Sequence, residues 1–190
     1  VEDQGDAFGD LGVLFILIVI LVYIVMATQF ESLLFPFIIM FTIPFAFTGV
    51  FLALWMTSTP LSLIALIGAI MLVGIVTKNG IVMVDYMNLL VERGSGVFDA
   101  VIAGGKSRLR PVLMTSFTTI LGMLPLAIGT GAGSETWQPM GIAVIGGLTC
   151  STLLTLFIIP ALYSVFVNRS QRKEKEKLAR LSAEHQASVH

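Results

Sequence analysis

Charged residues, cysteine and histidine are all scarce in this sequence of 190 residues. Charged residues make up 12% of it, whereas a soluble domain of this length carries roughly 25%. The single cysteine, Cys150, excludes an intrachain disulfide bond. The two histidines, His185 and His190, lie in a polar C-terminal segment, and nothing near them resembles a metal site. The net charge of −1 gives no reason to expect a nucleic-acid partner.

Motifs that would indicate an enzyme are also missing. The sequence has no glycine-rich nucleotide loop, no catalytic triad and no Cys/His metal cluster, so we predict neither an enzyme nor a bound cofactor. The N-terminus lacks the basic segment of a signal peptide, because residues 1–10 are acidic. A chain that begins with such an acidic segment looks like a piece of a longer protein.

Hydrophobic residues make up 56% of the sequence. They gather in five runs, at about 11–28, 35–56, 61–90, 111–130 and 139–167. Each run has about 18 residues or more, enough for a helix to cross a bilayer. Unbroken apolar runs favour helices over barrel strands, because in lipid the backbone must satisfy its own hydrogen bonds. We therefore predict an all-α membrane bundle of five transmembrane helices over 11–167, followed by a charged tail, 168–190.

Prolines punctuate these runs in two ways. Pro60, Pro111 and Pro139 stand where a helix is expected to begin, a position at which the missing N–H costs nothing. Three further prolines fall inside expected helices and should bend them or mark their ends. These are Pro44, Pro125 and Pro160.

The basic residues predict the orientation of the bundle in the membrane. Apart from Lys78, all of them fall between the third and fourth hydrophobic runs or in the tail. With five helices these two regions lie on the same side, which the positive-inside rule assigns to the cytoplasm. The N-terminus is then periplasmic and the C-terminus cytoplasmic. The ten residues are Arg93, Lys106, Arg108, Arg110, Arg169, Arg172, Lys173, Lys175, Lys177 and Arg180.

Lys78 lies near the middle of the third run, which makes it the most informative residue of the sequence. A charge at that depth costs about 3 kcal/mol by insertion scales, so it usually faces a partner or a wet cavity. Asn79 is its neighbour, and Asp85 follows two helical turns later on roughly the same face. Two readings stand for Lys78 and Asp85: an ion or proton relay, or packing residues that bond to a neighbouring helix.

The fourth run carries several hydroxyl side chains. Thr115, Thr119 and Gly122 have the spacing of one helix face, where small and hydroxylated residues let helices approach closely. Spacing alone therefore favours a packing role for Thr115 over a relay role. Arg108, at the start of this run, reads by itself as an ordinary cytoplasmic flanking charge.

Five sequence runs together resemble the resistance-nodulation-division (RND) efflux transporters, in the branch that exports hydrophobic and amphiphilic compounds. Their order and spacing cover nearly the whole chain as far as Val167. The runs are Gln29-Phe-Glu-Ser-Leu-Leu-Phe-Pro36, Gly74-Ile-Val-Thr-Lys-Asn-Gly80, Arg108-Leu-Arg-Pro-Val-Leu-Met-Thr-Ser116, Leu121-Gly-Met-Leu-Pro-Leu126, and Gly131-Ala-Gly-Ser-Glu135 leading into Gly141-Ile-Ala-Val-Ile-Gly-Gly147.

The resemblance implies an inner-membrane proton/drug antiporter of which this chain is the C-terminal membrane half. The family has twelve membrane helices in two similar halves, and this chain resembles helices eight to twelve. The resemblance implies that residues 1–10 are the end of the second periplasmic domain, which leads into the eighth helix. Lys78 matches the family lysine that engages two aspartates of the fourth helix. Thr115 matches a relay hydroxyl, and Arg108 an arginine linked to proton passage.

Partners also follow from the resemblance. They are the N-terminal half of the same transporter, two further copies in a homotrimer, a periplasmic adaptor, an outer-membrane channel and the lipid bilayer, with protons as the coupling ion. The aspartate pair and the drug-binding domains of the family are absent from this sequence. Two alternatives remain open: an RND-type transporter of another cargo, such as metal ions or lipids, and a truncated membrane fragment that transports nothing.

Overall fold

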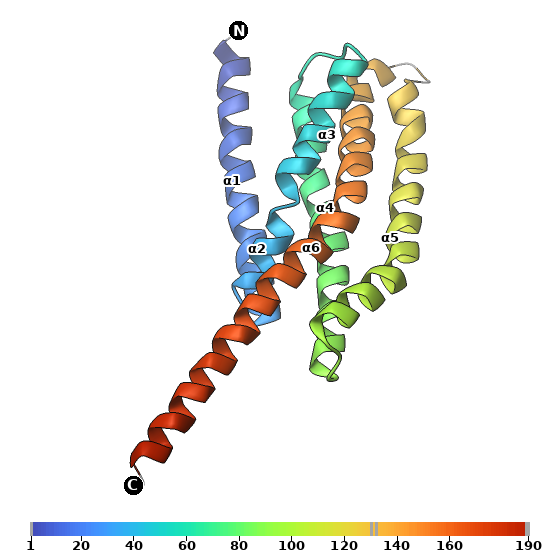
Figure 1. The fold of residues 1–190 in the computed structure, drawn as a ribbon. Helices are drawn as coiled ribbons and strands as arrows, with labels where there is room; N and C mark the ends of the chain where they lie inside the picture. Colours follow the sequence, from blue (N-terminus) through green and yellow to red (C-terminus); the bar gives the residue numbers. More distant parts are fainter. Residues whose placement is uncertain (1, 130, 132, 189–190) are drawn as a thin grey trace.

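The computed structural model describes residues 2–129, 131 and 133–188, and this part of the chain is folded into six α-helices without a strand. Figure 1 shows them side by side as an elongated bundle. The all-α prediction is therefore confirmed. The helices are α1 (Glu2–Phe30), α2 (Leu34–Met40), α3 (Ile43–Met56), α4 (Leu63–Glu92), α5 (Val97–Ile128) and α6 (Ser134–Ser188).

Five helical stretches of the described residues are long and apolar enough to cross a membrane, as predicted. The short helices α2 and α3 together form one of these stretches. The five stretches are Gly5–Phe30, Leu34–Met56, Leu63–Glu92, Val97–Ile128 and Ser134–Arg169.

The second stretch is interrupted, whereas the sequence analysis treated 35–56 as one helix. Helix α2 ends at Met40, and α3 begins at Ile43 with Pro44 in its first turn. Pro44 has no N–H to donate to the preceding turn. Thr42 contributes to the break, since its hydroxyl donates to the carbonyl oxygen of Ile39 at 2.6 Å. The bend expected at Pro44 is thus a full break between two helices.

Helix α5 begins earlier than predicted. Its first residue is Val97 rather than Pro111, and Pro111 lies in its interior. The first half is helical because Val97, Ala100 and Gly104 are buried, and a Cβ on Gly104 would lie 2.6 Å from Met87 of α4. Packing against α4 therefore stabilises a segment that sequence alone reads as a loop. Figure 1 shows that α5 bends midway along its length.

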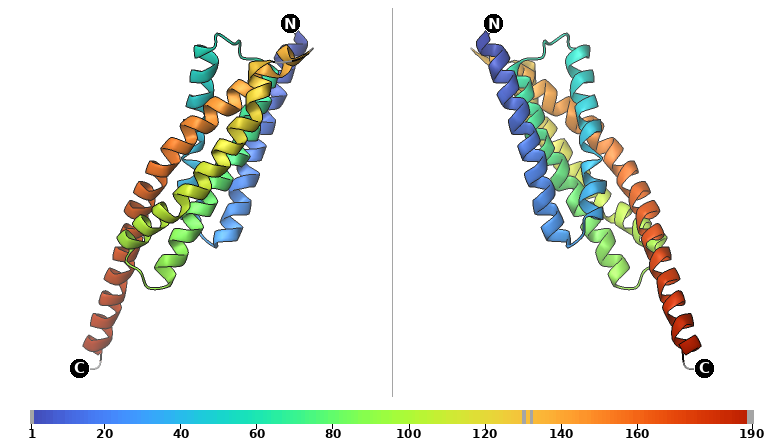
Figure 2. Two further views of the ribbon diagram at one scale, coloured as in Figure 1. Left: turned by 90° about the vertical axis from the view of Figure 1, so that its right-hand side faces the viewer. Right: turned by 90° about the vertical axis from the view of Figure 1, so that its left-hand side faces the viewer.

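Two other helices extend beyond the hydrophobic runs that predicted them. Helix α6 begins at Ser134, so Pro139 lies inside it, and it continues past 167 through the tail to Ser188. Figure 2 shows that it crosses the bundle obliquely and runs on beyond it, and Figure 1 shows that it bends part-way along its length. At the other end, residues 2–10 are the first turns of α1 rather than a separate segment. By contrast, α4 begins and ends within two residues of the predicted 61–90.

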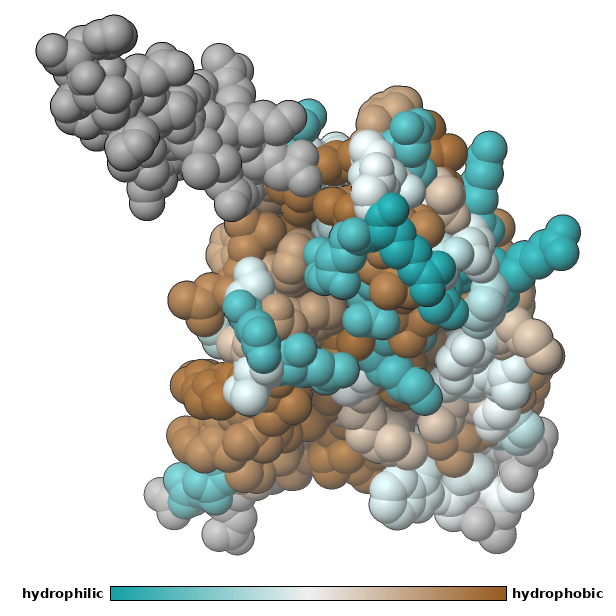
Figure 3. All heavy atoms as spheres, turned by 90° about the horizontal axis from the view of Figure 1, so that it is seen from below, coloured by the Kyte–Doolittle hydropathy of each residue, from teal (hydrophilic) through white to brown (hydrophobic). Residues whose placement is uncertain are grey.

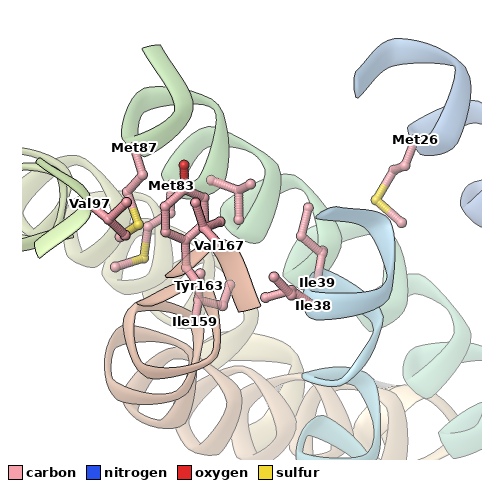
Figure 4. Packing of buried hydrophobic residues seen from close by; sticks show 10 residues of the cluster. Met26, Ile38, Ile39, Met83, Met87, Val97, Ile159, Tyr163 and Val167 are labelled. Atoms are coloured by element: carbon pink, nitrogen blue, oxygen red, sulfur yellow. The ribbon is translucent and has the colours of Figure 1, made fainter. Parts of the chain in front are cut away.

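The core lies around α4 and α6. About half of the apolar window of each is buried, 56% for α4 and 50% for α6, against 6% for α1 and 11% for α5. One of the two hydrophobic clusters draws residues from five helices, and Figure 4 shows Tyr163 of α6 among Met83, Met87 and Val97. Close contacts at glycine join α3 to α6: a Cβ on Gly146 would overlap the side chain of Ala53. Helices α1 and α5 are therefore the peripheral elements.

The two ends of the bundle differ in charge. Figure 1 places the N-terminus and the α3–α4 and α5–α6 connections at one end, and the α1–α2 turn, the α4–α5 connection and the C-terminus at the other. The second end carries Arg93, Lys106, Arg108 and Arg110, and Figure 3 shows hydrophilic side chains gathered over it. Apart from Lys78, the basic residues thus belong to the segments at this one end of the bundle, as the orientation prediction requires.

Candidate functional site

Lys78 lies midway along α4, with its side chain exposed. It lines a groove of about 310 Å³ between α4 and α1. The wall contributed by α1 is entirely apolar and includes Leu21, Val25 and Met26. No acidic side chain lines the groove within the part of the chain that the structure describes. The lysine thus has space beside it, and the described residues that line the groove provide no counter-charge for it.

A buried hydroxyl lies next to Lys78 in the same groove. Thr77 is 4% exposed, and its Oγ1 has no hydrogen-bond partner among the described residues. A threonine on a helix can donate to the backbone four residues earlier, yet this one does not. An unpaired buried hydroxyl costs free energy, so Thr77 offers an unused donor and acceptor beside the lysine.

Lys78 belongs to a continuous exposed stripe along α4, which we call the open face of α4. Its members are spaced three, four or seven residues apart, so they share one side of the helix. A Cβ added to Gly74 would meet nothing within 4 Å, so Gly74 does not serve a close helix contact here. The stripe consists of Ile67, Met71, Gly74, Lys78, Asp85, Leu89 and Glu92.

Asp85 and Asn79 have opposite surroundings. Asp85 is exposed on the open face, as predicted from its spacing, and lies about 11 Å along the helix axis from Lys78. Asn79 is 7% exposed and therefore points into the bundle rather than into the space beside the lysine. The structure places Asp85, and not Asn79, on the face of Lys78.

Arg108 is held against the C-terminal part of α4. Its guanidinium carbon lies 4.5 Å from the centre of the Tyr86 ring, which is a cation–π contact. Its Nε is buried without a hydrogen-bond partner among the described residues. Arg108 is thus a residue of α5 packed on α4, and not a loop residue in front of a helix as the sequence suggested.

Thr115 lies one turn after Pro111 with an exposed side chain. Its hydroxyl donates to the carbonyl oxygen of Pro111 at 2.9 Å. No residue of α5 lines the groove that holds Lys78. The structure therefore joins Lys78 to Asp85 on one face and Arg108 to Tyr86, but it does not bring Thr115 to the lysine.

The sequence matches the model of a known protein family. The family model of AcrB/AcrD/AcrF matches residues 1–167. The chain belongs to this family of RND efflux transporters. The resemblance inferred from the five sequence runs is thereby confirmed.

Individual members agree with this assignment. The chain is 39% identical over 172 residues to the swarming motility protein SwrC of Bacillus subtilis, and covers 16% of that protein. It is 44% identical over 156 residues to the multidrug resistance protein MdtC of Erwinia tasmaniensis, and covers 15% of it. A crystal structure of a heavy metal efflux pump superposes with a TM-score of 0.80 at 32% identity, over 88% of this chain and 17% of that one. The chain thus corresponds to a small part of each RND relative.

Sequence reasoning missed several residues of the site. Thr77 could have been found as the hydroxyl beside the intramembrane lysine. Tyr86 carries no sequence signal, because its contact with Arg108 joins α4 to the part of α5 that was read as a loop. The same holds for Thr152 of α6, whose partner is Ser116 of α5.

Proposed function

We propose that this chain supplies the C-terminal membrane part of a proton-driven RND permease, which exports hydrophobic or amphiphilic compounds across the bacterial inner membrane. The observation that carries the proposal is the setting of Lys78. A cation in the middle of a membrane helix needs a counter-charge or water. Among the described residues, the groove of Lys78 is lined by a buried hydroxyl but by no acid.

The counter-charge is supplied from outside this chain. In the family resemblance it is a pair of aspartates on the fourth helix of the N-terminal half, which would lie against the open face of α4. Protonation of those aspartates breaks their pairing with Lys78. A charge change in the middle of the membrane then shifts helices and drives distant parts of the transporter. Arg108 and Thr115, both on α5, belong to the same relay, and Arg108 lies on its cytoplasmic side.

The partners belong to the same proposal. The permease is a homotrimer that works with a periplasmic adaptor and an outer-membrane channel, and protons are its coupling ion. Its basic end, with Arg93 and Lys106, faces the cytoplasm, in keeping with the positive-inside rule.

A metal cargo is the second candidate, because the superposed crystal structure is that of a heavy metal efflux pump. The multidrug relatives favour the first candidate, since they are more similar in sequence at 44% against 32%. Cells that carry the full-length transporter distinguish the two. Added resistance to cationic dyes and detergents supports the first candidate, and added resistance to zinc or copper salts supports the second.

The relay is tested by Lys78→Met in the full-length polypeptide that carries this chain. Methionine keeps much of the length and the apolar stem but removes the charge. If Lys78 only packs, the variant should be neutral or even stabilising, since buried ion pairs are often no better than apolar isosteres. We expect normal expression and assembly but no efflux. Lys106→Met, at an exposed cytoplasmic-side position, is the control and should transport normally. Near-normal efflux by Lys78→Met would leave only the packing role.

A further inference from the structure

A hydrogen bond between two buried hydroxyls joins α5 to α6. The hydroxyl oxygens of Ser116 and Thr152 lie 2.9 Å apart, and either can be the donor. Ser116 is 3% exposed and Thr152 is 5% exposed. A small cavity of about 90 Å³ borders the pair, lined mainly by apolar side chains such as Phe117 and Leu153. Each of the two hydroxyls is therefore the hydrogen-bond partner of the other. The third hydroxyl of the lining, that of Thr149, donates to the carbonyl oxygen of Ile145 in its own helix.

This bond lies in the half of α5 that follows Pro111, where few side chains are buried. A second hydrogen bond between the two helices, from the Gln138 amide to the carbonyl oxygen of Ala127 at 3.0 Å, lies at the far end of α5. Helix α5 buries five residues, and three of them, Val97, Ala100 and Gly104, precede Pro111. Beyond Pro111 the buried residues are Val112 and Ser116. Pro111 removes one backbone hydrogen bond of the helix and so creates a point of bending. The first buried polar group after that point is Ser116.

The pair fixes the rotation of α5 about its axis. Successive residues of an α-helix are about 100° apart around the axis. With Ser116 directed at α6, Thr115 is directed away from α6, and its side chain is exposed. A rotation by one residue would separate the two hydroxyls and break this bond between the helices. Each hydroxyl could then bond only within its own helix, to a carbonyl oxygen of the preceding turn. The rotation would also turn Thr115 to another side of the bundle.

We propose that Ser116 and Thr152 are positioning residues, which together set the direction of Thr115. A pair of hydroxyls suits this task, because neither ionises near neutral pH and neither competes for a transported proton. The consequence for efflux rests on the proposed function, in which Thr115 belongs to the relay. The rotational role itself does not depend on it.

The rotational role is tested by thiol labelling in the full-length transporter. A Thr115→Cys variant, made in a Cys150→Ala background, reports how accessible position 115 is to a maleimide. Thr152→Val removes the hydroxyl at nearly constant volume. We expect it to change the labelling rate by about threefold or more, the factor that corresponds to a typical interhelical hydrogen bond in a membrane. Thr118→Val is the matched control, because the Thr118 hydroxyl is exposed and bonds only to Met114 of its own helix. An unchanged labelling rate in Thr152→Val overturns the proposal.

The functional consequence is read from the pH dependence of efflux with native Thr115. We expect Thr152→Val and Ser116→Ala to shift this profile at normal expression, and Thr118→Val to leave it in place. The exchange of the two side chains, Ser116→Thr with Thr152→Ser, keeps both hydroxyls and the total volume, and should restore the profile. An altered labelling rate with an unchanged pH profile supports the positioning role and removes Thr115 from the relay. That outcome counts against the proposed function, and not against the hydroxyl pair.

Discussion

Lys78 and Arg108 are both cations of the membrane-spanning region, yet their surroundings differ. Lys78 lines an apolar groove without an acid in its lining. Arg108 rests on an aromatic ring within the same chain. An arginine can stack on a ring because its guanidinium is planar and weakly hydrated, whereas a lysine ammonium is compact and strongly hydrated. Under the proposed function Lys78 therefore depends on a partner from elsewhere, while the position of Arg108 is set by a contact within this chain.

Tyr86 is expected to hold Arg108 in place through its ring rather than through its hydroxyl. Tyr86→Leu removes the cation–π contact, which is worth about 0.5–2 kcal/mol, and lets the guanidinium leave the end of α4. We expect a severalfold loss of efflux rate at normal expression. Tyr86→Phe keeps the ring and should transport like the unaltered protein.

The efflux rate of a fluorescent dye, measured on the two Tyr86 variants side by side, decides the point. Equal loss in both would assign the effect to the hydroxyl. Full activity in Tyr86→Leu would show that Arg108 needs no ring at this position.

At the scale of single helices, sequence predicts well where the signals are local. Helix α4 has a long apolar run and a serine cap, since Ser62 accepts a hydrogen bond from the N–H of Ala65 at 3.2 Å, and its bounds were predicted within two residues. The start of α5 was missed because its first half is stabilised by burial of Val97 and Ala100, which is a tertiary effect. The sequence therefore predicts Pro111 as the first residue of the helix, although it lies in the middle of a bent helix.

The same distinction explains which parts of the site were predictable. Lys78 and Asp85 were placed on one face from their spacing, because helical periodicity is a local property. The contacts of Arg108 with Tyr86 and of Ser116 with Thr152 join separate helices. Packing decides such pairs, and periodicity gives no register between two helices.

The contact between α5 and α6 yields a prediction at the scale of helices. A Cβ on Gly141 would lie 2.8 Å from the backbone nitrogen of Ala127 and 3.1 Å from its Cα. Backbone atoms cannot turn aside as a side chain can, so Gly141→Ala should push the two helices apart. We expect a loss of about 1–3 kcal/mol of stability, typical of overpacking, seen as a lower melting temperature of the purified transporter.

Gly122→Ala is the control for this prediction. Gly122 also lies on α5, and a Cβ there would meet nothing within 4 Å. Alanine is the better helix former, so this change should be neutral or slightly stabilising. A melting temperature that falls equally in both variants would mean that loss of glycine flexibility, and not the close approach of α5 to α6, is responsible.

At the scale of the whole molecule, the arrangement of ends predicts topology. Figure 1 places the α5–α6 connection opposite to the α4–α5 connection and to the C-terminus. With the basic end in the cytoplasm, a cysteine at Ser134 should react with an impermeant thiol reagent added outside. Cysteines at Ser95 and Ser182 should react only after the membrane is opened. If cysteines at positions 134 and 182 were labelled from the same side, the predicted orientation would be contradicted, as would a membrane crossing by Ser134–Arg169.

The uncovered surfaces of the bundle predict that this chain does not transport by itself. The membrane window of α1 is only 6% buried, and Lys78, Asp85 and Glu92 on the open face of α4 are exposed. A charged face of this kind is costly against lipid. In the RND relatives, 15–17% of the length corresponds to this chain, so the remainder is available to cover that face.

We therefore expect the chain expressed alone to insert into the membrane, as its five spans allow, but to confer no drug resistance and no proton-coupled flux. Co-expression with the N-terminal remainder of the transporter as a separate polypeptide should restore both, because α4 then receives its acidic neighbour. Lys78→Met in the co-expressed chain should abolish the restored flux without preventing assembly. Drug/proton exchange by the purified chain in liposomes would contradict this expectation, since it would show that Lys78 needs no acid from outside the chain.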